Sequence, residues 1–219
     1  MIVAFISDPH SHAEKCEAAI NDARENGAGK IVCLGDVVGY GEEPGQTIKL
    51  VRDNCSECVM GNHDAAVSGK CSTWNFNPRA KRGVDRNRGQ LSETDIAWLR
   101  ELPYVVETTN YACAHGEFSL PHRFEYVFDI FDSLRSFRTM TQQILLVGHT
   151  HNPCAFDFPP KGMPTALSIL KPVEIRSDHR YMFNPGSVGE PRNYALPYPS
   201  YILFDDSKMT VNFRILRGE

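Results

Sequence analysis

The sequence lacks any excess of positive charge. Its 219 residues contain 23 Lys and Arg against 27 Asp and Glu, which gives a formal net charge of −4. A chain with this balance has no overall attraction for nucleic acid or for an anionic membrane, so any polyanion has to be bound by a local group of side chains. Bulk charge therefore identifies no partner.

The N-terminus has no basic leader and no long apolar run. The first apolar stretch, residues 2–6, meets Asp8 too early for a secretory signal or a membrane span. The seven cysteines are an odd number at irregular spacing, which favours reduced thiols over a disulfide framework. Cys55 and Cys58 form one C-x-x-C pair, but the second pair of a zinc ribbon is missing. We therefore expect a cytoplasmic protein that does not associate with membranes.

Several common catalytic motifs are also absent. The chain has no Walker loop, no G-x-S-x-G elbow and no H-E-x-x-H zinc helix. Gly39-Tyr40-Gly41 begins like a dinucleotide-binding loop, but Pro44 stands where the third glycine is required. Because no internal repeat or Pro/Ser linker divides the chain, residues 1–219 are predicted to form a single domain.

Short β-rich runs alternate with helical stretches over the first hundred residues. Strands are expected at residues 2–7, 31–35 and 58–61, and helices at 13–26 and 46–54. This alternation predicts parallel βαβ units, which have their ligand-binding edge at the carboxyl ends of the strands. Polar residues follow each of these strands, so the pattern places a site at that edge.

A helical segment at about 71–102 is predicted to cap this edge. Ser92 and Asp95 have the spacing of a capping box at the start of its second amphipathic stretch, and Pro103 ends that stretch. A further helix is expected at 124–137. The rest of the second half is predicted to be mostly β-strands, at residues 104–108, 111–116, 144–148, 154–158, 181–184, 200–206 and 209–216.

Five of the eight histidines directly follow strand-like runs. Together with neighbouring carboxylates and an amide they form a mixed nitrogen and oxygen donor set, which suits Mn, Fe, Co, Ni or Zn better than Ca. One ion needs about four ligands, and this set is larger. Two ions about 3.5 to 4 Å apart would use the surplus, with one carboxylate bridging them. The donors are Asp8, His10, Asp36, Asn62, His63, His115, His149 and His151.

These residues fall into motifs that resemble the calcineurin-like metallophosphoesterases. The motifs occur in the family's order: Asp8-x-His10, Gly35-Asp36, Gly61-Asn62-His63-Asp64, His115-Gly116 and Gly148-His149-x-His151. The later segment 184–189, Asn-Pro-Gly-Ser-Val-Gly, resembles the small bacterial and archaeal phosphodiesterase branch, although its Pro and Gly also predict a tight turn without any functional role.

The resemblance implies a four-layer α-β-β-α sandwich of two mixed β-sheets with flanking helices and a dimetal site at the sheet edge. Two divalent ions are implied, with Mn as the first expectation and Fe, Ni, Co or Zn as alternatives. By the same resemblance the first ion is held by Asp8, His10 and His151 and the second by Asn62, His115 and His149, with Asp36 as the bridge.

The activity implied by the resemblance is hydrolysis of a phosphate ester, with a phosphodiester favoured, by in-line attack of a hydroxide shared between the ions. His63 would stabilise the transition state and protonate the leaving oxygen, and Asp64 would orient its imidazole. The alternatives left open are a phosphomonoesterase acting on protein or small molecules, a dinucleoside polyphosphate hydrolase, and a non-catalytic metal-binding scaffold. Nucleic acid is considered only as a substrate.

Two features depart from the family pattern or add to it. Ser11-His12 stands where the family usually has Gly-Asn. We expect Ser11 to cap the next helix and consider His12 as a substrate contact, a residue behind the ligands or a solvent-facing side chain. Residues 79–88 hold five basic side chains and one acidic one. They form either a solvated helix face or a basic lip for a phosphorylated substrate, in which Arg82 is the candidate contact.

Overall fold

The computed structural model describes residues 1–217, which form two six-stranded mixed sheets. In the first sheet β1 pairs in parallel with β2 and antiparallel with β11. The order of this sheet is β3 (Glu57–Cys58), β2 (Ala28–Cys33), β1 (Ile2–Ile6), β11 (Ser200–Asp205), β12 (Thr210–Ile215) and β9 (Val173–Glu174). The order of the second is β4 (Val105–Glu107), β5 (Tyr111–Ala114), β6 (Ile144–Leu146), β10 (Arg180–Asn184), β7 (Cys154–Phe158) and β8 (Thr165–Ala166).

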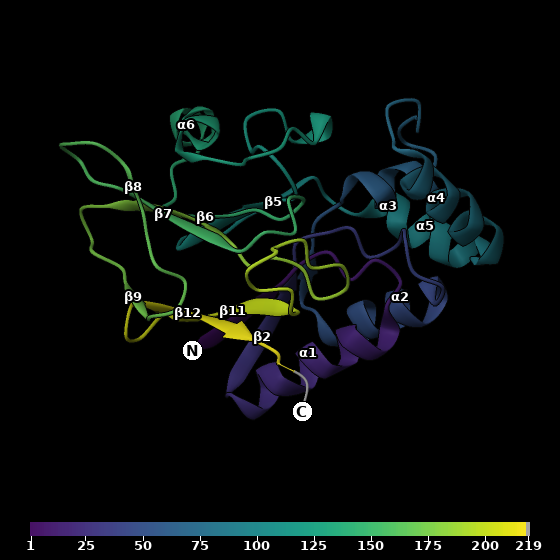
Figure 1. Ribbon diagram of the computed structural model, residues 1–219, viewed down its shortest axis with the longest axis horizontal. Coiled ribbons are helices and arrows are strands. Elements are labelled where there is room, and N and C mark those ends of the chain that lie inside the picture. The colour runs from purple at the N-terminus through teal and green to yellow at the C-terminus, as the bar shows by residue number, and fades with distance from the viewer. Residues whose placement is uncertain (218–219) are drawn as a thin grey trace.

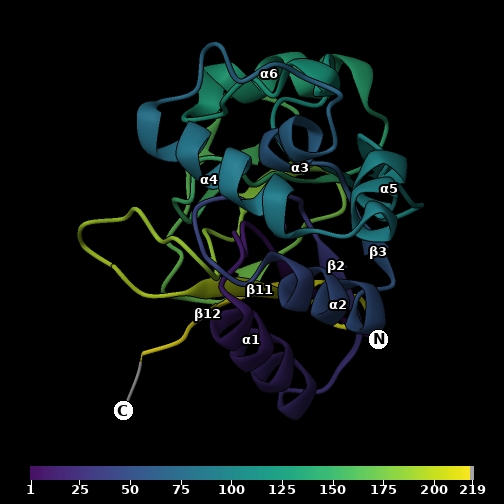
Figure 2. The same ribbon diagram turned by 90° about the vertical axis from the view of Figure 1, so that its right-hand side faces the viewer.

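Helices cover the outer faces of both sheets (Figure 1). Helices α1 (Ala13–Glu25) and α2 (Pro44–Asn54) lie on the first sheet, and α6 (Ile130–Thr139) lies over the second. Helices α3 (Asn62–Val67), α4 (Pro78–Gln90) and α5 (Glu93–Glu101) gather at one end of the molecule (Figure 2). The predicted four-layer sandwich is confirmed. None of the helices that the structure describes is long and apolar enough to cross a membrane.

The side chains of β1 point alternately into two apolar layers, one between the sheets and one beneath the helices of the first sheet. Val3 and Phe5 point into the core between the sheets, where Phe5 packs edge-on against Tyr111 of the other sheet at 5.0 Å between ring centroids. Ala4 and Ile6 point the other way and pack beneath α1. Both faces of this central strand are thus apolar, and each large side chain buried there contributes roughly 1.5–3 kcal/mol.

Most of the predicted elements are present, and Ser92 is the predicted cap: its Oγ atom accepts a hydrogen bond from the Asp95 amide at 3.1 Å, while the Asp95 carboxylate accepts from the Ser92 hydroxyl rather than from the Ser92 amide that a full capping box would use. The helix expected at 124–137 was placed too early. A 3-10 turn, Pro121–Arg123, is followed by Phe124 with φ of 51°, and α6 begins only at Ile130. Asp129 explains this start, because its side chain accepts the amide hydrogens of Phe131 and Asp132.

The predicted cap at Ser11 is wrong. The residue that precedes α1 is His12, and it makes no side-chain capping bond. Ser11 has a left-handed backbone with φ of 59°, and its hydroxyl donates instead to Asn87 Oδ1 of α4 at 2.8 Å. The loop after β1 is therefore fastened to the predicted cap segment rather than to the helix that follows it.

Candidate metal centre

The predicted ligands converge beyond the carboxyl ends of five strands. Asp8 and His10 follow β1, Asp36 follows β2, Asn62 follows β3, His115 follows β5, and His149 and His151 follow β6. The two sheets meet at this edge, so Asp8 and His151 lie in contact although they are 143 positions apart. Among the residues that the structure describes, two groups of side chains have the spacing of a metal site, and both contain Asp36.

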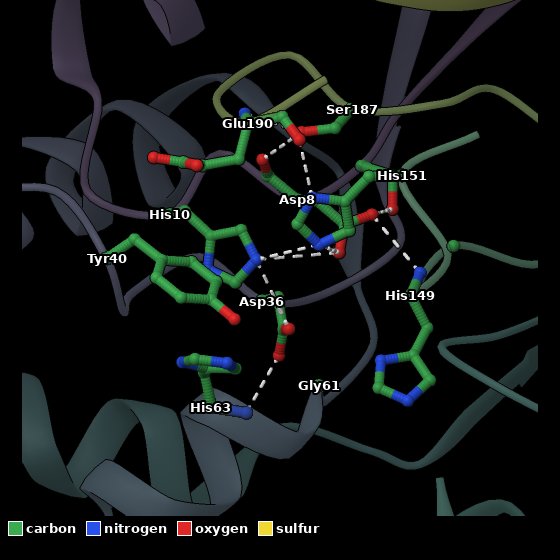
Figure 3. Close-up of polar contacts among 12 residues, drawn as sticks. Asp8, His10, Asp36, Tyr40, Gly61, His63, His149, His151, Ser187 and Glu190 are labelled. Carbon is green, nitrogen blue, oxygen red and sulfur yellow. Dashed lines mark hydrogen bonds and ion pairs between the residues drawn. The ribbon is translucent and has the colours of Figure 1, made fainter. Parts of the chain in front are cut away.

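The first group consists of Asp8, His10, Asp36 and His151 (Figure 3). His10 Nε2 lies 3.1 Å from His151 Nε2 and 3.5 Å from Asp36 Oδ2. Asp8 Oδ1 lies 3.2 Å from His151 Nε2. All four side chains are buried. The sequence predicted this set as the first metal site together with its bridge.

The second group consists of Asp36, His115 and His149. His115 Nε2 lies 3.3 Å from Asp36 Oδ2, the same oxygen that faces His10 in the first group. Since one carboxylate oxygen faces histidines of both groups, Asp36 has the position expected of a bridging ligand. Asn62 completes the predicted second set, and its Oδ1 atom is buried without a hydrogen-bond partner among the described residues.

The free donor atoms fit metal ions. Within the described part of the chain, Asp8 Oδ1, Asp36 Oδ2 and His115 Nε2 are also buried without hydrogen-bond partners. Such orphaned atoms cost free energy unless something occupies the space between them. The other carboxylate oxygens are satisfied, because Asp8 Oδ2 accepts from the Ser7 hydroxyl and Asp36 Oδ1 accepts from the His63 amide at 2.8 Å. The donor set of imidazole, carboxylate and amide suits a transition metal.

Backbone carbonyls fix the tautomers of three histidines. The Nδ1–H groups of His10, His115 and His151 donate to Val38 O, Leu34 O and Glu190 O at 2.9, 2.7 and 2.6 Å. A carbonyl oxygen can only accept, so each Nδ1 carries a hydrogen and leaves Nε2 as the atom that faces the centre. These are the orientations that metal-binding imidazoles require.

The backbone is strained where the ligands attach. Five of the seven predicted ligands have φ between 48° and 68°: Asp8, His10, Asp36, His149 and His151. This region costs a non-glycine residue roughly 1–2 kcal/mol, and such strain persists only where the surroundings hold it. Here the loops after β1 and β2 hold each other, since the amides of Asp8 and His10 donate to Gly35 O and Asp36 O at 3.1 and 3.0 Å.

The titration behaviour of the histidines reflects burial beside two carboxylates. Burial lowers the pKa of His149 to about 3 and that of His63 to about 4. Burial alone would also lower the pKa of His115, but the adjacent Asp36 and Asp8 carboxylates raise it to about 10. The position between the carboxylates thus favours a positive charge, which a bound cation would supply.

His63 stands beside this centre at the start of α3. Its ring centroid lies 4.7 Å from that of His10 and 5.0 Å from that of Phe76, and its Nδ1 atom finds no hydrogen-bond partner among the described residues. Gly39 makes this packing possible, because a Cβ atom there would lie 2.4 Å from His63 Nδ1. The imidazole therefore lies beside the predicted metal ligands.

Both carboxylate oxygens of Asp64 accept hydrogen bonds from backbone amides rather than from the His63 ring. Asp64 Oδ1 accepts the Val38 amide at 3.2 Å, and Oδ2 accepts the Gly61 amide at 3.0 Å. Its carboxyl group is buried, and burial together with the Asp36 charge raises its pKa to about 7. Asp64 thus ties α3 to the loops after β2 and β3, which differs from the orienting role implied by the sequence resemblance.

Of the two candidate substrate contacts, only His12 lies near the centre. Its Nε2 atom lies 2.8 Å from Glu190 Oε1, and Arg79 holds the same carboxylate at 2.8 and 3.0 Å. These two partners lower the pKa of Glu190 to about 2 although its partial burial acts in the opposite direction. Arg82 is exposed and does not line the cavity beside the centre. Arg79, in the first turn of α4, does not line the cavity either, but it contacts Glu190 and the ring of Tyr40.

Sequence reasoning missed Tyr40 and the residues around it. The Tyr40 ring lies 4.7 Å from that of His10 and 4.8 Å from that of His63 (Figure 3). The guanidinium groups of Arg79 and Arg192 lie 4.6 and 5.5 Å from the Tyr40 ring, and Arg192 donates to its hydroxyl at 3.0 Å. The sequence feature that indicates Tyr40 is its position four residues after Asp36, in a Gly-Tyr-Gly turn. That turn had suggested only a dinucleotide loop.

The segment 184–189 braces the first group of ligands. The hydroxyl of Ser187 donates to Asp8 O at 2.8 Å, and the Gly189 amide donates to the same oxygen at 3.1 Å. Gly189 is required, because a Cβ atom there would lie 2.0 Å from Pro9 O. The next residue, Glu190, accepts the His151 Nδ1–H bond through its carbonyl. The predicted turn is thus a support for the ligands.

Comparison with known proteins relates this chain to one family of phosphoesterases and to individual proteins of similar sequence or structure. The model of the calcineurin-like phosphoesterase superfamily domain matches residues 1–209. An uncharacterized protein of Methanocaldococcus jannaschii is 32% identical over 216 residues, which are 96% of this chain and 85% of that protein. The crystal structure of a metallophosphoesterase from Sphaerobacter thermophilus matches with a TM-score of 0.84 at 29% identity, covering 100% of this chain and 90% of that one.

A second solved structure shares the fold at lower identity. A hypothetical protein from Pyrococcus horikoshii OT3 gives a TM-score of 0.75 at 16% identity, with coverage of 100% of this chain and 88% of that one. The two-sheet arrangement therefore persists after most of the sequence has changed.

Proposed function

Because this chain belongs to the calcineurin-like phosphoesterase superfamily, we propose that it is an enzyme that hydrolyses a phosphodiester with the help of two divalent metal ions. The observation that carries the proposal is the pair of buried donor groups that share Asp36. Their free atoms point at one another, as ligand atoms do before a metal binds. Mn²⁺ is the first choice for both positions, and Fe, Ni, Co and Zn suit the same donors.

Two bound ions would polarise the phosphoryl oxygens and lower the pKa of a water molecule between them. The protein's part is to hold the donors in place. Asp8, His10 and His151 would hold one ion, with Asp36 shared. Asn62, His115 and His149 are assigned to the other by the same arrangement. The backbone bonds to the three Nδ1 atoms keep the rings from turning away.

His63 is assigned the role of the general acid. It stands outside both donor groups but packs against His10, so its imidazole borders the place where a phosphoryl group would sit. Burial favours its neutral form in the free protein. A dianionic transition state nearby would favour the protonated form, and the proton could then pass to the leaving oxygen.

The preference for a diester rests on the segment 184–189, which resembles the phosphodiesterase branch. The test is an assay of chelated protein against bis(p-nitrophenyl) phosphate and p-nitrophenyl phosphate, with Mn, Ni, Co, Zn or Mg added back singly. Metal-dependent release of nitrophenolate, faster from the diester, is expected. Faster release from the monoester would make the protein a phosphatase. Bound metal without turnover of either ester would favour the non-catalytic scaffold.

A further inference from the structure

A cavity of about 410 Å³ opens directly onto the metal centre. One wall consists of the centre's own residues Asn62, His63 and His149. The segment from Cys71 to Ala80, at the start of the cap, forms a second wall, and the loop from His122 to Tyr126 forms a third. Its volume lies within the roughly 300–1,000 Å³ of small-molecule sites. It is on the side of His63, where the proposed mechanism puts the leaving group.

The walls of the cavity carry several aromatic rings. Trp74 lines the cavity and is 86% exposed, so its indole is free to contact a ligand there. Phe76 packs against the His63 ring, and Tyr126 stacks on His149 with ring centroids 3.8 Å apart and planes 10° apart. An aromatic surface thus continues from the centre out to the rim at Trp74.

Polar groups lie among these rings. Ser72 and Asn75 bring a hydroxyl and an amide to the same wall as Trp74, and Arg123 brings a guanidinium to the wall formed by the loop from His122 to Tyr126. Asn77 Oδ1 accepts the Ala80 amide at 2.9 Å, which fixes this wall to the start of α4. Rings beside amide donors and acceptors match a nucleobase, which offers both a π-face and hydrogen-bonding edges. A lipid chain would leave the polar groups unpaired.

We propose that this cavity binds a nucleoside as the leaving group of the substrate, with its base stacked on the Trp74 indole. That the nucleoside is a leaving group rests on the proposed function. Binding of the base does not, because it requires no turnover. The sugar would lie between the rim and His63, which places the phosphate at the donor groups. The substrate class is therefore a nucleotide ester.

The test uses the indole itself as the probe. The chain has two tryptophans, and Trp98 lies on α5 in a different hollow beside Cys55. In a Trp98→Phe protein loaded with one chosen metal, emission reports Trp74 alone. Adenosine 5′-monophosphate, ribose 5-phosphate and phenyl phosphate are titrated separately. We expect saturable quenching by the nucleotide and an affinity at least about tenfold above that of the sugar phosphate, as loss of one stacked ring predicts.

Trp74→Ala should lower the nucleotide affinity about tenfold, measured by calorimetry, and leave that of ribose 5-phosphate unchanged. Tyr194→Ala is the matched control, because Tyr194 is fully exposed and does not line the cavity. Equal affinities for nucleotide and sugar phosphate would overturn the proposal. Phenyl phosphate binding as tightly as the nucleotide would replace the nucleoside by a simple aryl group, which also contradicts it.

These outcomes are distinct from failure of the proposed hydrolysis. A protein that binds the nucleotide selectively but turns over no ester keeps the cavity assignment and loses the activity. A protein that hydrolyses bis(p-nitrophenyl) phosphate but does not prefer the nucleotide keeps the activity and loses the cavity assignment.

Discussion

His10 Nε2 and His151 Nε2 face each other at 3.1 Å although the residues are 141 positions apart. Both rings have their Nδ1–H committed to a backbone carbonyl, so two lone pairs meet unless a cation lies between them. Asp8 and Asp36 add negative charge to the same small volume. The arrangement is unfavourable without a cation, and this explains why the fold and metal binding should be coupled.

Removal of metal should therefore destabilise the protein. A ligand that binds only the folded state at about one hundred times its Kd adds about 2.7 kcal/mol of stability. For a chain of this size, that corresponds to a fall in Tm of roughly 5–11 °C on chelation. Scanning calorimetry with and without a chelator measures it. An unchanged Tm in protein from which elemental analysis shows the metal to have been removed would contradict this coupling.

Asp36→Asn should lose metal from both positions, because Oδ2 of Asp36 faces histidines of both donor groups. We expect the metal content, measured by elemental analysis, to fall below about one ion per chain. Asp53→Asn is the control, since that exposed carboxylate pairs with Lys49 and lies on α2. Two ions retained in Asp36→Asn would contradict the bridging assignment.

His63→Ala should keep its metal and lose turnover. The ring contributes no atom to either donor group, so metal content should match the wild type. Loss of a general acid lowers kcat by about 10²- to 10⁴-fold. Steady-state kinetics on a diester with an alkyl leaving group gives the clearest reading, because such a leaving group needs protonation most. Full activity in this variant would rule out His63 as the acid.

Asp64→Ala should weaken the fold more than the chemistry. The change leaves the buried amides of Val38 and Gly61 without their acceptor, at a cost of about 1–3 kcal/mol for each. Asp64→Asn keeps one acceptor oxygen and should lose less stability. Urea unfolding of both variants measures the difference. A normal free energy of unfolding with a much lower kcat would instead support the orienting role implied by the family resemblance.

Stability should depend on pH through Asp22, which joins α1 to β12. Burial acts to raise the pKa of Asp22, but bonds from Arg214, at 3.1 and 3.3 Å, and from Tyr201 outweigh it and lower the pKa. A carboxyl group whose pKa is lower in the folded than in the unfolded state stabilises the fold above its unfolded value. This stabilisation is lost as the pH falls through the folded value.

The comparison of wild type with Asp22→Asn tests the direction of this pH dependence. The wild type should be more stable by about 1 kcal/mol near neutral pH. This difference in the free energy of unfolding should narrow below about pH 4, where the carboxyl group of the unfolded chain begins to protonate. Urea unfolding at several pH values gives the difference directly. A difference that widens toward acid would mean that the pKa of Asp22 is raised.

The sequence located the ligands because each one directly follows a strand, and strand ends in a twisted sheet share an edge. Asp8, Asp36 and His115 could be placed in this way from residues near them in the chain. What the sequence did not reveal depends on contacts between distant segments. Glu190 approaches His12 and Arg79 only because the turn after β10 folds back over β1.

Neighbouring residues in the sequence were a poor guide where a side chain had more than one possible hydrogen-bond partner. The hydroxyl of Ser11 is a good helix cap, but its left-handed backbone turns it toward Asn87. Asp64 is adjacent to His63, yet the amides of Val38 and Gly61 take both of its oxygens. Arg82 lies in the same basic run as Arg79, and only the position of the first turn of α4 decides which one contacts Glu190. None of these choices is visible in residue order.

The most direct measurement is a titration of chelated protein with Mn²⁺, with hydrolysis of bis(p-nitrophenyl) phosphate followed against the number of ions bound per chain. If two donor groups bridged by Asp36 carry the reaction, hydrolysis should rise until two ions are bound and then stay constant. Full hydrolysis with one ion bound, or hydrolysis by the metal-free protein, would contradict the account.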